Sequence, residues 1–431
     1  MGRRMKHTDI GDIPADWKLQ TFEETFRVLS NNTLSRENLN NSDGAVRNIH
    51  YGDILTKFTE VLNCNEEDIP YLNDLSLITA STQLLQDGDI VIADTAEDET
   101  VGKTIEVRNL GNGKLVAGLH TIPCRVKKGK FAPGWLGYYM NSNIYHDQII
   151  PFITGIKVSS ISKTAIAETM ILVPPIDEQE RIIETLMQIE RLIKKEKVII
   201  DKFKSFKSGC LTKMFPRDGA TTPEIRCSEY TDAWEQRKLG EICDFINGDR
   251  SSNYPSASDF QENGIPFIGS DSLGTTLIDK NKMRFITQEK YSHMNGIKIQ
   301  NEDFLYTLRG AGFGKCSIAD FSEGTVASSL VGIRCKRDIL APKFLVQWFS
   351  SSDAECEKQK AVNGSTAQNI SVEDMKAYSL KLPKINEQEK IYEYLFSIDN
   401  LITLHQRKYY KFQCVKSGLI SMLISINNQS H

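Results

Sequence analysis

A glycine-rich stretch at residues 309–315 has the residue types of a phosphate-binding loop. It runs from Arg309 through three glycines to Lys315. A Walker loop, however, needs Gly where Arg309 stands and Ser or Thr where Cys316 stands, and the spacing also misses G-x-G-x-x-G. Nucleotide binding is therefore not predicted. Such a loop after a strand can instead bring backbone amides and Arg309 close to a DNA phosphate or base edge; the alternative is a plain tight turn.

Other catalytic patterns are incomplete. Asp177-Glu178 resembles an acidic helicase box but is better explained as the start of a helix. The Asn-Pro-Pro-aromatic tetrad of amino-methyltransferases does not occur. His120 and Cys124 form an isolated pair, whereas a metal site needs three or four ligands. The sequence thus predicts a non-catalytic chain with no cofactor or metal of its own.

Composition indicates a cytoplasmic protein. The 431 residues contain nine scattered cysteines without a C-x-x-C pair, which is typical of reduced thiols. No run approaches the roughly 18 apolar residues of a membrane span, so no membrane association is expected. The net charge of −4 excludes a globally basic DNA binder. Locally, residues 191–213 hold eight Lys/Arg against two acids, and no acid follows Asp399. Such basic stripes can meet a polyanion, or can be solvated helix faces.

Residues 176–215 recur at residues 385–424. Fifteen of the 40 aligned positions are identical at a constant offset of 209, including Glu178/Glu387 and Gln179/Gln388. The repeat extends upstream: Ala132-Pro133 matches Ala341-Pro342 at the same offset, and Asp89 matches Asp303 after the offset drifts. A repeat of this size means that the chain consists of two tandem units, which suits a bipartite target or two copies of a partner.

Each unit is expected to be a globular block followed by a long helix. The blocks look mixed α/β with short strands, for which GDIVIAD (88–94) and EDFLYTL (302–308) are the clearest candidates. The expected organisation is a first block at 1–175, a first helix at 176–215, a linker at 216–229, a second block at 230–384, a second helix at 385–424 and a tail at 425–431. The framing residues agree between the blocks and most others differ, which fits one scaffold with two recognition surfaces.

Each long segment carries the signals of a helix with a coiled-coil seam. Prolines precede both, Asp177 and Asn386 suit the N-cap, and Glu180 and Glu389 follow as in a capping box. Steps of four and three residues from Ile182 reach eight apolar residues in ten, and the second copy does the same, with polar breaks at the matched positions Glu196/His405 and Lys207/Lys416. About 38 helical residues span roughly 57 Å. We expect the two helices to pack on each other, antiparallel and with reciprocal contacts; a dimerisation coil is the alternative.

The chain resembles the specificity (S) subunit of type I restriction–modification enzymes over essentially its full length. The resemblance rests on the proline-preceded IDEQERI and INEQEKI helix starts, on the helices that follow, and on FPRDGATTPEIRCSEYTDAWEQRKLGEI at 215–242. It implies two target recognition domains, each reading one half of an asymmetric, split double-stranded DNA sequence. It further implies that the helices form an antiparallel spacer and, with nearby surfaces, dock two methyltransferase (M) subunits, while motor-nuclease (R) subunits complete the complex. S-adenosylmethionine would be bound by the M subunits, and ATP with Mg by the R subunits.

The physics of DNA recognition agrees with this interpretation. Half-sites about one helical turn apart, roughly 34–36 Å, need recognition modules held at a fixed spacing. Lys and Arg supply affinity through phosphates, and loop side chains supply base choice. Any single candidate has a solvated surface position as its alternative. The candidate DNA-binding residues are Arg125, Lys127, Lys128, Lys130, Lys157, Ser159 and Ser160 in the first block, and Arg309, Lys315, Arg337, Lys343, Ser365, Gln368 and Asn369 in the second.

A rival hypothesis is a tandem-domain, coiled-coil scaffold that binds proteins and not DNA. Neighbouring genes for an adenine methyltransferase and a helicase–nuclease would discriminate between the two. The target sequence, its spacer length and whether the assembly restricts or only methylates DNA are not encoded in any pattern found above.

Overall fold

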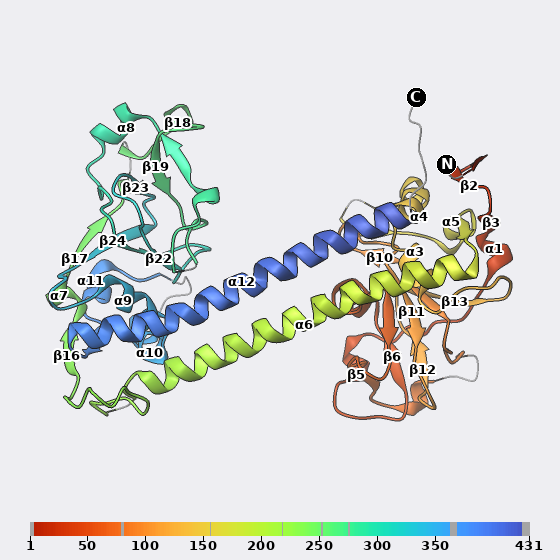
Figure 1. The fold of residues 1–431 in the computed structure, drawn as a ribbon, viewed down its shortest axis with the longest axis horizontal. Coiled ribbons are helices and arrows are strands. Elements are labelled where there is room, and N and C mark those ends of the chain that lie inside the picture. The colour runs from red at the N-terminus through yellow and green to blue at the C-terminus, as the bar shows by residue number, and fades with distance from the viewer. Residues whose placement is uncertain are drawn as a thin grey trace. The chain divides into compact units, whose positions relative to one another are not determined.

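The computed structural model describes residues 4–78, 82–155, 157–217, 219–250, 253–274, 276–362 and 369–424. The chain forms two compact units. Unit 1 comprises Met1–Lys195 and Tyr409–His431, and unit 2 comprises Glu196–Lys408. Each unit therefore contains one block, part of the long helix α6 (Ile176–Met214) and part of the long helix α12 (Ile385–Leu423) (Figure 1).

Unit 1 is built on two mixed sheets. The larger has the strand order β4-β13-β9-β11-β7, and the smaller β12-β6-β8-β5. Their strands are β4 (Phe26–Val28), β13 (Thr121–Val126), β9 (Ile90–Ala93), β11 (Thr104–Arg108), β7 (Val61–Asn63), β12 (Leu115–Ala117), β6 (Arg47–Ile49), β8 (Tyr71–Leu72) and β5 (Leu39–Asn40). Around them lie β1 (Met5–Thr8) with β2 (Gly11–Pro14), β10 (Thr95–Ala96) with β14 (Ser159–Ser160), and the short helices α1 (Phe22–Thr25), α2 (Tyr51–Thr56), α3 (Trp135–Tyr139), α4 (Asn143–Ile149) and α5 (Lys163–Ala167).

Unit 2 also has two sheets, with orders β17-β24-β21-β22 and β18-β20-β19-β23. The strands are β17 (Cys243–Asn247), β24 (Leu330–Cys335), β21 (Phe304–Thr307), β22 (Cys316–Ile318), β18 (Phe260–Gln261), β20 (Arg284–Ile286), β19 (Ile265–Ile268) and β23 (Thr325–Val326). The short helices are α7 (Leu239–Ile242), α8 (Gln288–His293), α9 (Pro342–Phe349), α10 (Ser352–Val362) and α11 (Val372–Lys376).

The two strands expected from sequence, at 88–94 and 302–308, are confirmed as β9 and β21. Each pairs with a strand on both sides, and all four of its residues are buried. Burial of both faces explains why these runs are continuously apolar or aromatic instead of alternating.

Each block closes on itself directly before its long helix. In unit 1, β15 (Met170–Val173) pairs antiparallel with β3 (Lys18–Thr21). In unit 2, β25 (Ser379–Leu382) pairs antiparallel with β16 (Glu235–Lys238). The last strand of each block therefore lies beside a strand near the start of the block, and the chain leaves the block through one proline-containing junction.

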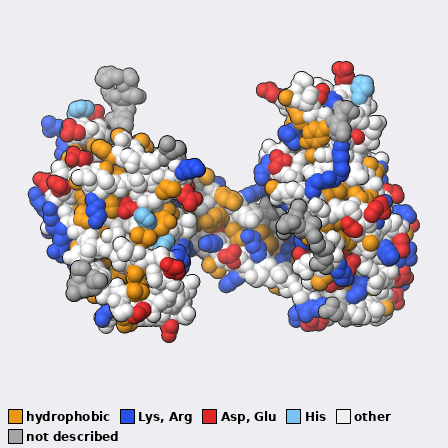
Figure 2. Space-filling view, turned by 180° about the vertical axis from the view of Figure 1, so that it is seen from behind, with side chains coloured by type: hydrophobic (Ala, Val, Ile, Leu, Met, Phe, Trp, Pro, Cys, Tyr) orange, Lys and Arg blue, Asp and Glu red, His pale blue; other side chains and the backbone are white. Residues whose placement is uncertain are grey.

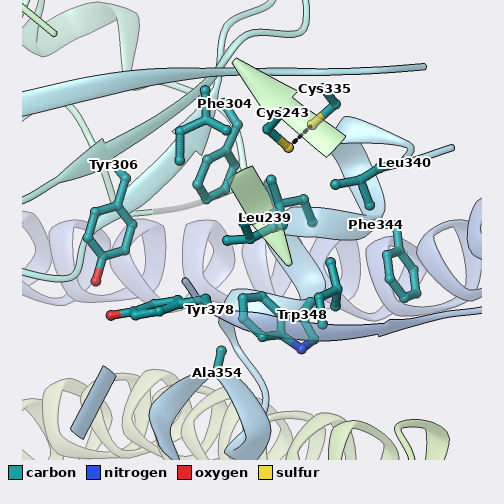
Figure 3. Close-up of a cluster of buried hydrophobic side chains, with 14 of the residues drawn as sticks. Leu239, Cys243, Phe304, Tyr306, Cys335, Leu340, Phe344, Trp348, Ala354 and Tyr378 are labelled. Carbon is teal, nitrogen blue, oxygen red and sulfur yellow. Dashed lines mark hydrogen bonds between the residues drawn. The ribbon is translucent and has the colours of Figure 1, made fainter. Parts of the chain in front are cut away.

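The ends of the long helices are part of the block cores. One core cluster of unit 1 contains Ile182, Ile183 and Leu186 of α6 together with Trp17 and Trp135 of the block. The corresponding cluster of unit 2 contains residues of both helices, such as Leu211 and Ile391, and the block residues drawn in Figure 3, among them Phe304, Phe344 and Trp348. Beside them the Sγ atoms of Cys243 and Cys335 lie 3.8 Å apart as free thiols (Figure 3).

Candidate DNA-recognition and subunit-docking site

The helices α6 and α12 run antiparallel in unit 2. Lys207 of α6 forms an ion pair with Asp399 of α12, with Nζ–O distances of 2.7 and 2.8 Å. Eleven residues earlier in α6, Glu196 pairs with His405, which lies later in α12, and the Phe203 ring stacks on His405 at 5.8 Å between centroids. Because the α12 number rises as the α6 number falls, the helices are antiparallel here.

The same arrangement occurs in unit 1. Lys416 of α12 forms an ion pair with Glu190 of α6 at 2.6 Å. It also pairs with Glu60, which lies in the block just ahead of β7. Ile183 precedes Glu190 in α6, and Leu423, which follows Lys416 in α12, packs against the core cluster that contains Ile183. The helices are therefore antiparallel in unit 1 too.

These contacts obey the reciprocity expected from the repeat. Lys207 and Lys416 are equivalent at the offset of 209, and so are Glu190 and Asp399. The Lys207–Asp399 pair in unit 2 is thus the counterpart of the Lys416–Glu190 pair in unit 1. Glu196 and His405 are equivalent to each other and pair with each other. The predicted antiparallel, reciprocal helix pair is confirmed.

The predicted seam positions all face protein. Every position from Ile182 to Met214 in the stripe of α6, and every matched position of α12, is buried or half-buried. The 3.5-residue spacing of apolar side chains accounts for this burial, because it keeps one face of each helix towards its neighbour.

A buried glutamine fastens each block to its long helix. The Gln179 side chain is fully buried; its Oε1 accepts a hydrogen bond from the Ala132 N–H at 2.9 Å. Its Nε2 donates to the carbonyl oxygens of Pro174 at 2.8 Å and Lys130 at 3.3 Å. An amide is the side-chain group that supplies one acceptor and two donors in this geometry.

The second copy repeats all three bonds. Gln388, also fully buried, accepts from the Ala341 N–H at 2.9 Å and donates to the carbonyls of Pro383 at 2.9 Å and Ile339 at 2.8 Å. Each partner stands 209 residues after its counterpart. We call Gln179 and Gln388 the latch glutamines. Their partners are all backbone atoms, so the latch does not depend on the side chains of the block.

The predicted N-caps were wrong. The helices begin at Ile176 and Ile385, so Asp177 and Asn386 lie inside the first turn and do not cap it. The N–H groups of Glu178 and Gln179 donate to the Pro175 carbonyl, and those of Glu387 and Gln388 donate to the Lys384 carbonyl. The repeated glutamine is explained instead by the latch, whereas Glu178 accepts a hydrogen bond from Trp17 Nε1 at 2.9 Å and Glu387 pairs with Arg226 at 2.7 Å.

Arg125 is held by a bidentate ion pair within unit 1. Its Nε and Nη2 donate to Asp89 at 2.7 and 2.6 Å, and these hydrogen bonds raise the pKa of the guanidinium. The equivalent Arg334 makes the same pair with Asp303 in unit 2, at 2.9 and 2.7 Å. The two acids are almost fully buried. Arg125, a candidate DNA-binding residue from the sequence, is thus engaged in an ion pair within its own block.

Several candidate basic residues lie close to the starts of the long helices. Lys127, Lys128 and Lys130 are exposed on the segment after β13. In unit 2, Arg337 and Lys343 both pair with Glu302, at 3.1 and 3.4 Å. Arg337 is the counterpart of Lys128, but Gly88 stands at the position of Glu302 in unit 1, so the two surfaces differ in charge.

A second group of candidates meets at the end of the central strand. In unit 2 Arg309 follows β21 and forms an antiparallel bridge with Asn369. In unit 1 the equivalent residues Thr95 and Ser160 pair in the same way, as part of β10 and β14. We call this the strand-end position. Ser159 lies beside it on β14, and Lys157 is exposed just ahead of β14.

The glycine-rich loop of residues 310–314 connects β21 to β22. Lys315 is exposed at its end, and Cys316 begins a strand, whereas a phosphate loop continues into a helix. Gly310 and Gly314 have φ of 84° and 83°, which makes this a turn that needs glycine. Ser365 and Gln368 lie outside the described residues.

The sequence interpretation missed part of the strand-end position. In unit 1 the Asp94 carboxylate lies 3.4 Å from His120 Nδ1 and accepts a hydrogen bond from Thr95 at 2.8 Å. The Tyr51 ring meets His120 edge-on, at 5.3 Å between centroids. In unit 2, Arg250 lies close enough to Arg309 to lower its pKa, in addition to the larger effect of burial. Aligning residues 94–95 with 308–309 through the insertions would have found this correspondence.

The exposed faces carry both signs of charge. Figure 2 shows Lys and Arg interspersed with Asp and Glu on the face drawn, in keeping with the net charge of −4. Within the described ranges, no cluster of three metal-ligating side chains occurs, and no helix is long and apolar enough to cross a membrane.

A family comparison identifies the class of this protein. The model of the type I restriction modification DNA specificity domain matches the chain twice, over residues 14–204 and 231–411. The chain therefore belongs to this family, and it is the specificity, non-catalytic subunit of a type I restriction–modification system.

Curated relatives carry the same description. The putative type I restriction enzyme MjaX specificity subunit of Methanocaldococcus jannaschii is 23% identical over 435 residues, covering 97% of this chain and 95% of that protein. The EcoKI specificity subunit of Escherichia coli K12 is 24% identical over 270 residues, covering 60% of this chain and 56% of that protein.

Solved structures show the same fold at low identity. The crystal structure of the type I restriction–modification S subunit from M. genitalium superposes with a TM-score of 0.57 at 12% identity, covering 98% of this chain and 99% of that one. A chain from a study of complex assembly and conformational transition in a type I system gives a TM-score of 0.56 at 16% identity, covering 95% and 98%.

Proposed function

We propose that this chain reads a split, asymmetric double-stranded DNA sequence, one half with each block, and that its helices dock two M subunits. R subunits complete the restriction complex in the cytoplasm. S-adenosylmethionine is then bound by the M subunits, and ATP with Mg by the R subunits. One observation carries this proposal: the three latch hydrogen bonds recur in the two units, while the side chains at the strand-end position differ.

The latch supports the idea of exchangeable recognition blocks. Because its partners are backbone atoms, two blocks with different side chains are fastened to equivalent helices by the same three hydrogen bonds. A frame of this kind lets base-reading residues change while the scaffold stays the same.

The helix pair offers two equivalent docking patches. Leu192 and Leu401 are equivalent and each is 39% exposed; Phe206 and Val415 are equivalent and 52% and 38% exposed. Unit 1 therefore presents Leu192 with Val415, and unit 2 presents Leu401 with Phe206. Exposed apolar side chains that recur in both copies favour a partner surface over scattered surface residues, and two patches favour two copies of one partner.

We expect the isolated chain to show no methyl transfer, DNA cleavage or ATP hydrolysis, and sequence-specific methylation to appear when M subunits and S-adenosylmethionine are added. Transfer of a radiolabelled methyl group to DNA measures this. Robust methylation by the chain alone would contradict the proposal.

Single substitutions test the docking patches. Leu401→Glu should abolish docking of the M subunit at unit 2, and Leu192→Glu should abolish docking at unit 1, because a buried unpaired carboxylate opposes docking. Each single variant should therefore bind one M subunit, and the double variant should bind none. Leu75→Glu, at a 52% exposed leucine outside the two long helices, is the matched control. Native mass spectrometry of the mixtures gives the stoichiometry; two M subunits on the double variant would sink the docking assignment.

A further inference from the structure

The strand-end position has the same backbone in both units. In unit 1 the Asp94 N–H donates to the His120 carbonyl at 3.1 Å, and the Ile161 N–H donates to the Asp94 carbonyl at 2.9 Å. In unit 2 the Leu308 N–H donates to the Ser329 carbonyl at 2.8 Å, and the Ile370 N–H donates to the Leu308 carbonyl at 3.0 Å. The repeat thus delivers corresponding side chains to one place on each block.

The side chains at this place differ between the two units, because Asp94 and Thr95 of unit 1 correspond to Leu308 and Arg309 of unit 2. Unit 1 places the Asp94 acceptor there, held by Thr95 and next to His120. His120 has a φ of 55°, a conformation that residues other than glycine rarely adopt, so surrounding contacts fix its backbone. Unit 2 places Arg309 there, with Asn369 across the bridge.

Arg125 and Arg334 each form an ion pair with a buried aspartate, whereas Arg309 does not. It is half-buried, and the positive charge of Arg250 acts on it, yet neither residue has an ion pair among the described residues. A partly desolvated guanidinium beside a second one is unfavourable unless an acceptor-rich group binds there. The glycine-rich loop beside Arg309 packs closely against Ser270, because a Cβ added at Gly312 would lie 2.5 Å from the Ser270 Cβ.

We propose that the strand-end position is the base-reading point of each block, with Arg309 contacting a guanine in one half-site and Asp94 accepting from the exocyclic amine of cytosine or adenine in the other. This inference rests on the proposed function. It follows from the bidentate match of Arg to the guanine O6 and N7 atoms, and from the acceptor character of a carboxylate opposite the cytosine N4 or adenine N6 amine. Asp94 is kept an acceptor by the Thr95 hydroxyl, which donates to it.

The test reconstitutes full-length variants with M subunits and sequences the methylated products from a randomised DNA library. Arg309→Ala should weaken methylation of the original target roughly tenfold or more, and it should relax the requirement for one guanine in one half-site only. Asp94→Asn should change one position in the other half-site. Arg309→Lys should relax the same guanine as Arg309→Ala, because it keeps the charge but loses the two-pronged donor.

Arg217→Ala is the control, since Arg217 is an exposed arginine of the linker whose Nε already donates to the Thr212 carbonyl at 3.0 Å. It should leave the motif unchanged. Binding of M subunits and the circular dichroism spectrum verify that each variant is folded. If Arg309→Ala weakens all sequences equally, Arg309 contacts a phosphate and the inference is overturned. If the variants keep a bipartite motif unchanged, the inference is likewise overturned while the proposed function stands; if the wild-type complex yields no bipartite motif, the proposed function itself fails.

Discussion

Gln388→Ala is expected to destabilise unit 2 by about 2–4 kcal/mol while leaving unit 1 intact. The substitution removes three hydrogen bonds from a fully buried side chain and leaves the Ala341 N–H and the carbonyls of Ile339 and Pro383 without it. Each unsatisfied buried group costs about 1–3 kcal/mol, partly recovered by water and relaxation. Gln179→Ala should do the same to unit 1.

Hydrogen exchange read separately in the two units measures this effect, because two units need not unfold as one. Loss of protection should centre on residues 339–341 and β25 for Gln388→Ala. Gln388→Glu should destabilise unit 2 at least as much as Gln388→Ala, since a carboxylate cannot donate to the two carbonyls. Gln188→Ala, at an exposed glutamine of α6, is the control and should lie within about 0.5 kcal/mol of wild type. Latch variants that behave like this control would show that the three bonds are dispensable.

The second large effect concerns the equivalent lysines of the helix pair. Lys207 has one carboxylate partner, Asp399, which also accepts from Thr276 and Gln347. Lys416 has two, Glu60 and Glu190. Asp399→Asn leaves a mostly buried ammonium without a carboxylate, which costs about 3–5 kcal/mol at full burial and about 2–3 kcal/mol here, after allowing for partial exposure.

Glu190→Gln should behave differently, because Lys416 keeps Glu60. Burial, together with the neighbouring charge of Glu60, raises the pKa of Glu190 despite the opposing effect of Lys416. A carboxyl group with a raised pKa in the folded state favours folding at low pH, and this contribution is lost as the pH rises through the folded-state pKa. Glu190→Gln should therefore be neutral or stabilising at pH 7, and the difference from wild type should vanish as the pH falls below the ordinary range of a glutamate.

Denaturant unfolding followed across pH checks both variants. The matched controls are Asp201→Asn and Glu184→Gln, two exposed carboxylates of α6. Equal destabilisation by Asp399→Asn and Glu190→Gln at neutral pH would contradict the difference in partner number as its cause.

The antiparallel pairing of the two long helices could be predicted from the sequence because it follows from the local periodicity of apolar residues. The stripe from Ile182 to Met214 and its copy specified which helix face is buried, and the offset of 209 specified which contacts must be reciprocal. The Glu196–His405 and Lys207–Asp399 pairs fall where this logic puts them.

The candidate site was less predictable because its partners are far apart in sequence. Arg125 is 36 residues from Asp89, and only strand pairing brings the two together, so an arginine that looked available for DNA is occupied. The latch glutamine was hidden by the stronger local signal of a capping box. His120 and Asp94 belong to loops where insertions shift the repeat, and no short-range spacing marks them as neighbours.

The central claim is that each block reads its own half of the DNA target, and a block exchange tests it most directly. Residues 1–175 are replaced by the corresponding block of another family member, with the junction at Pro174-Pro175 ahead of α6, and the chimera is assembled with M subunits. The latch should still form, since it needs only the backbone of the incoming block. Sequencing of the methylated DNA should then show one half of the motif changed and the other half unchanged. A motif in which both halves change, or neither does, would contradict the account.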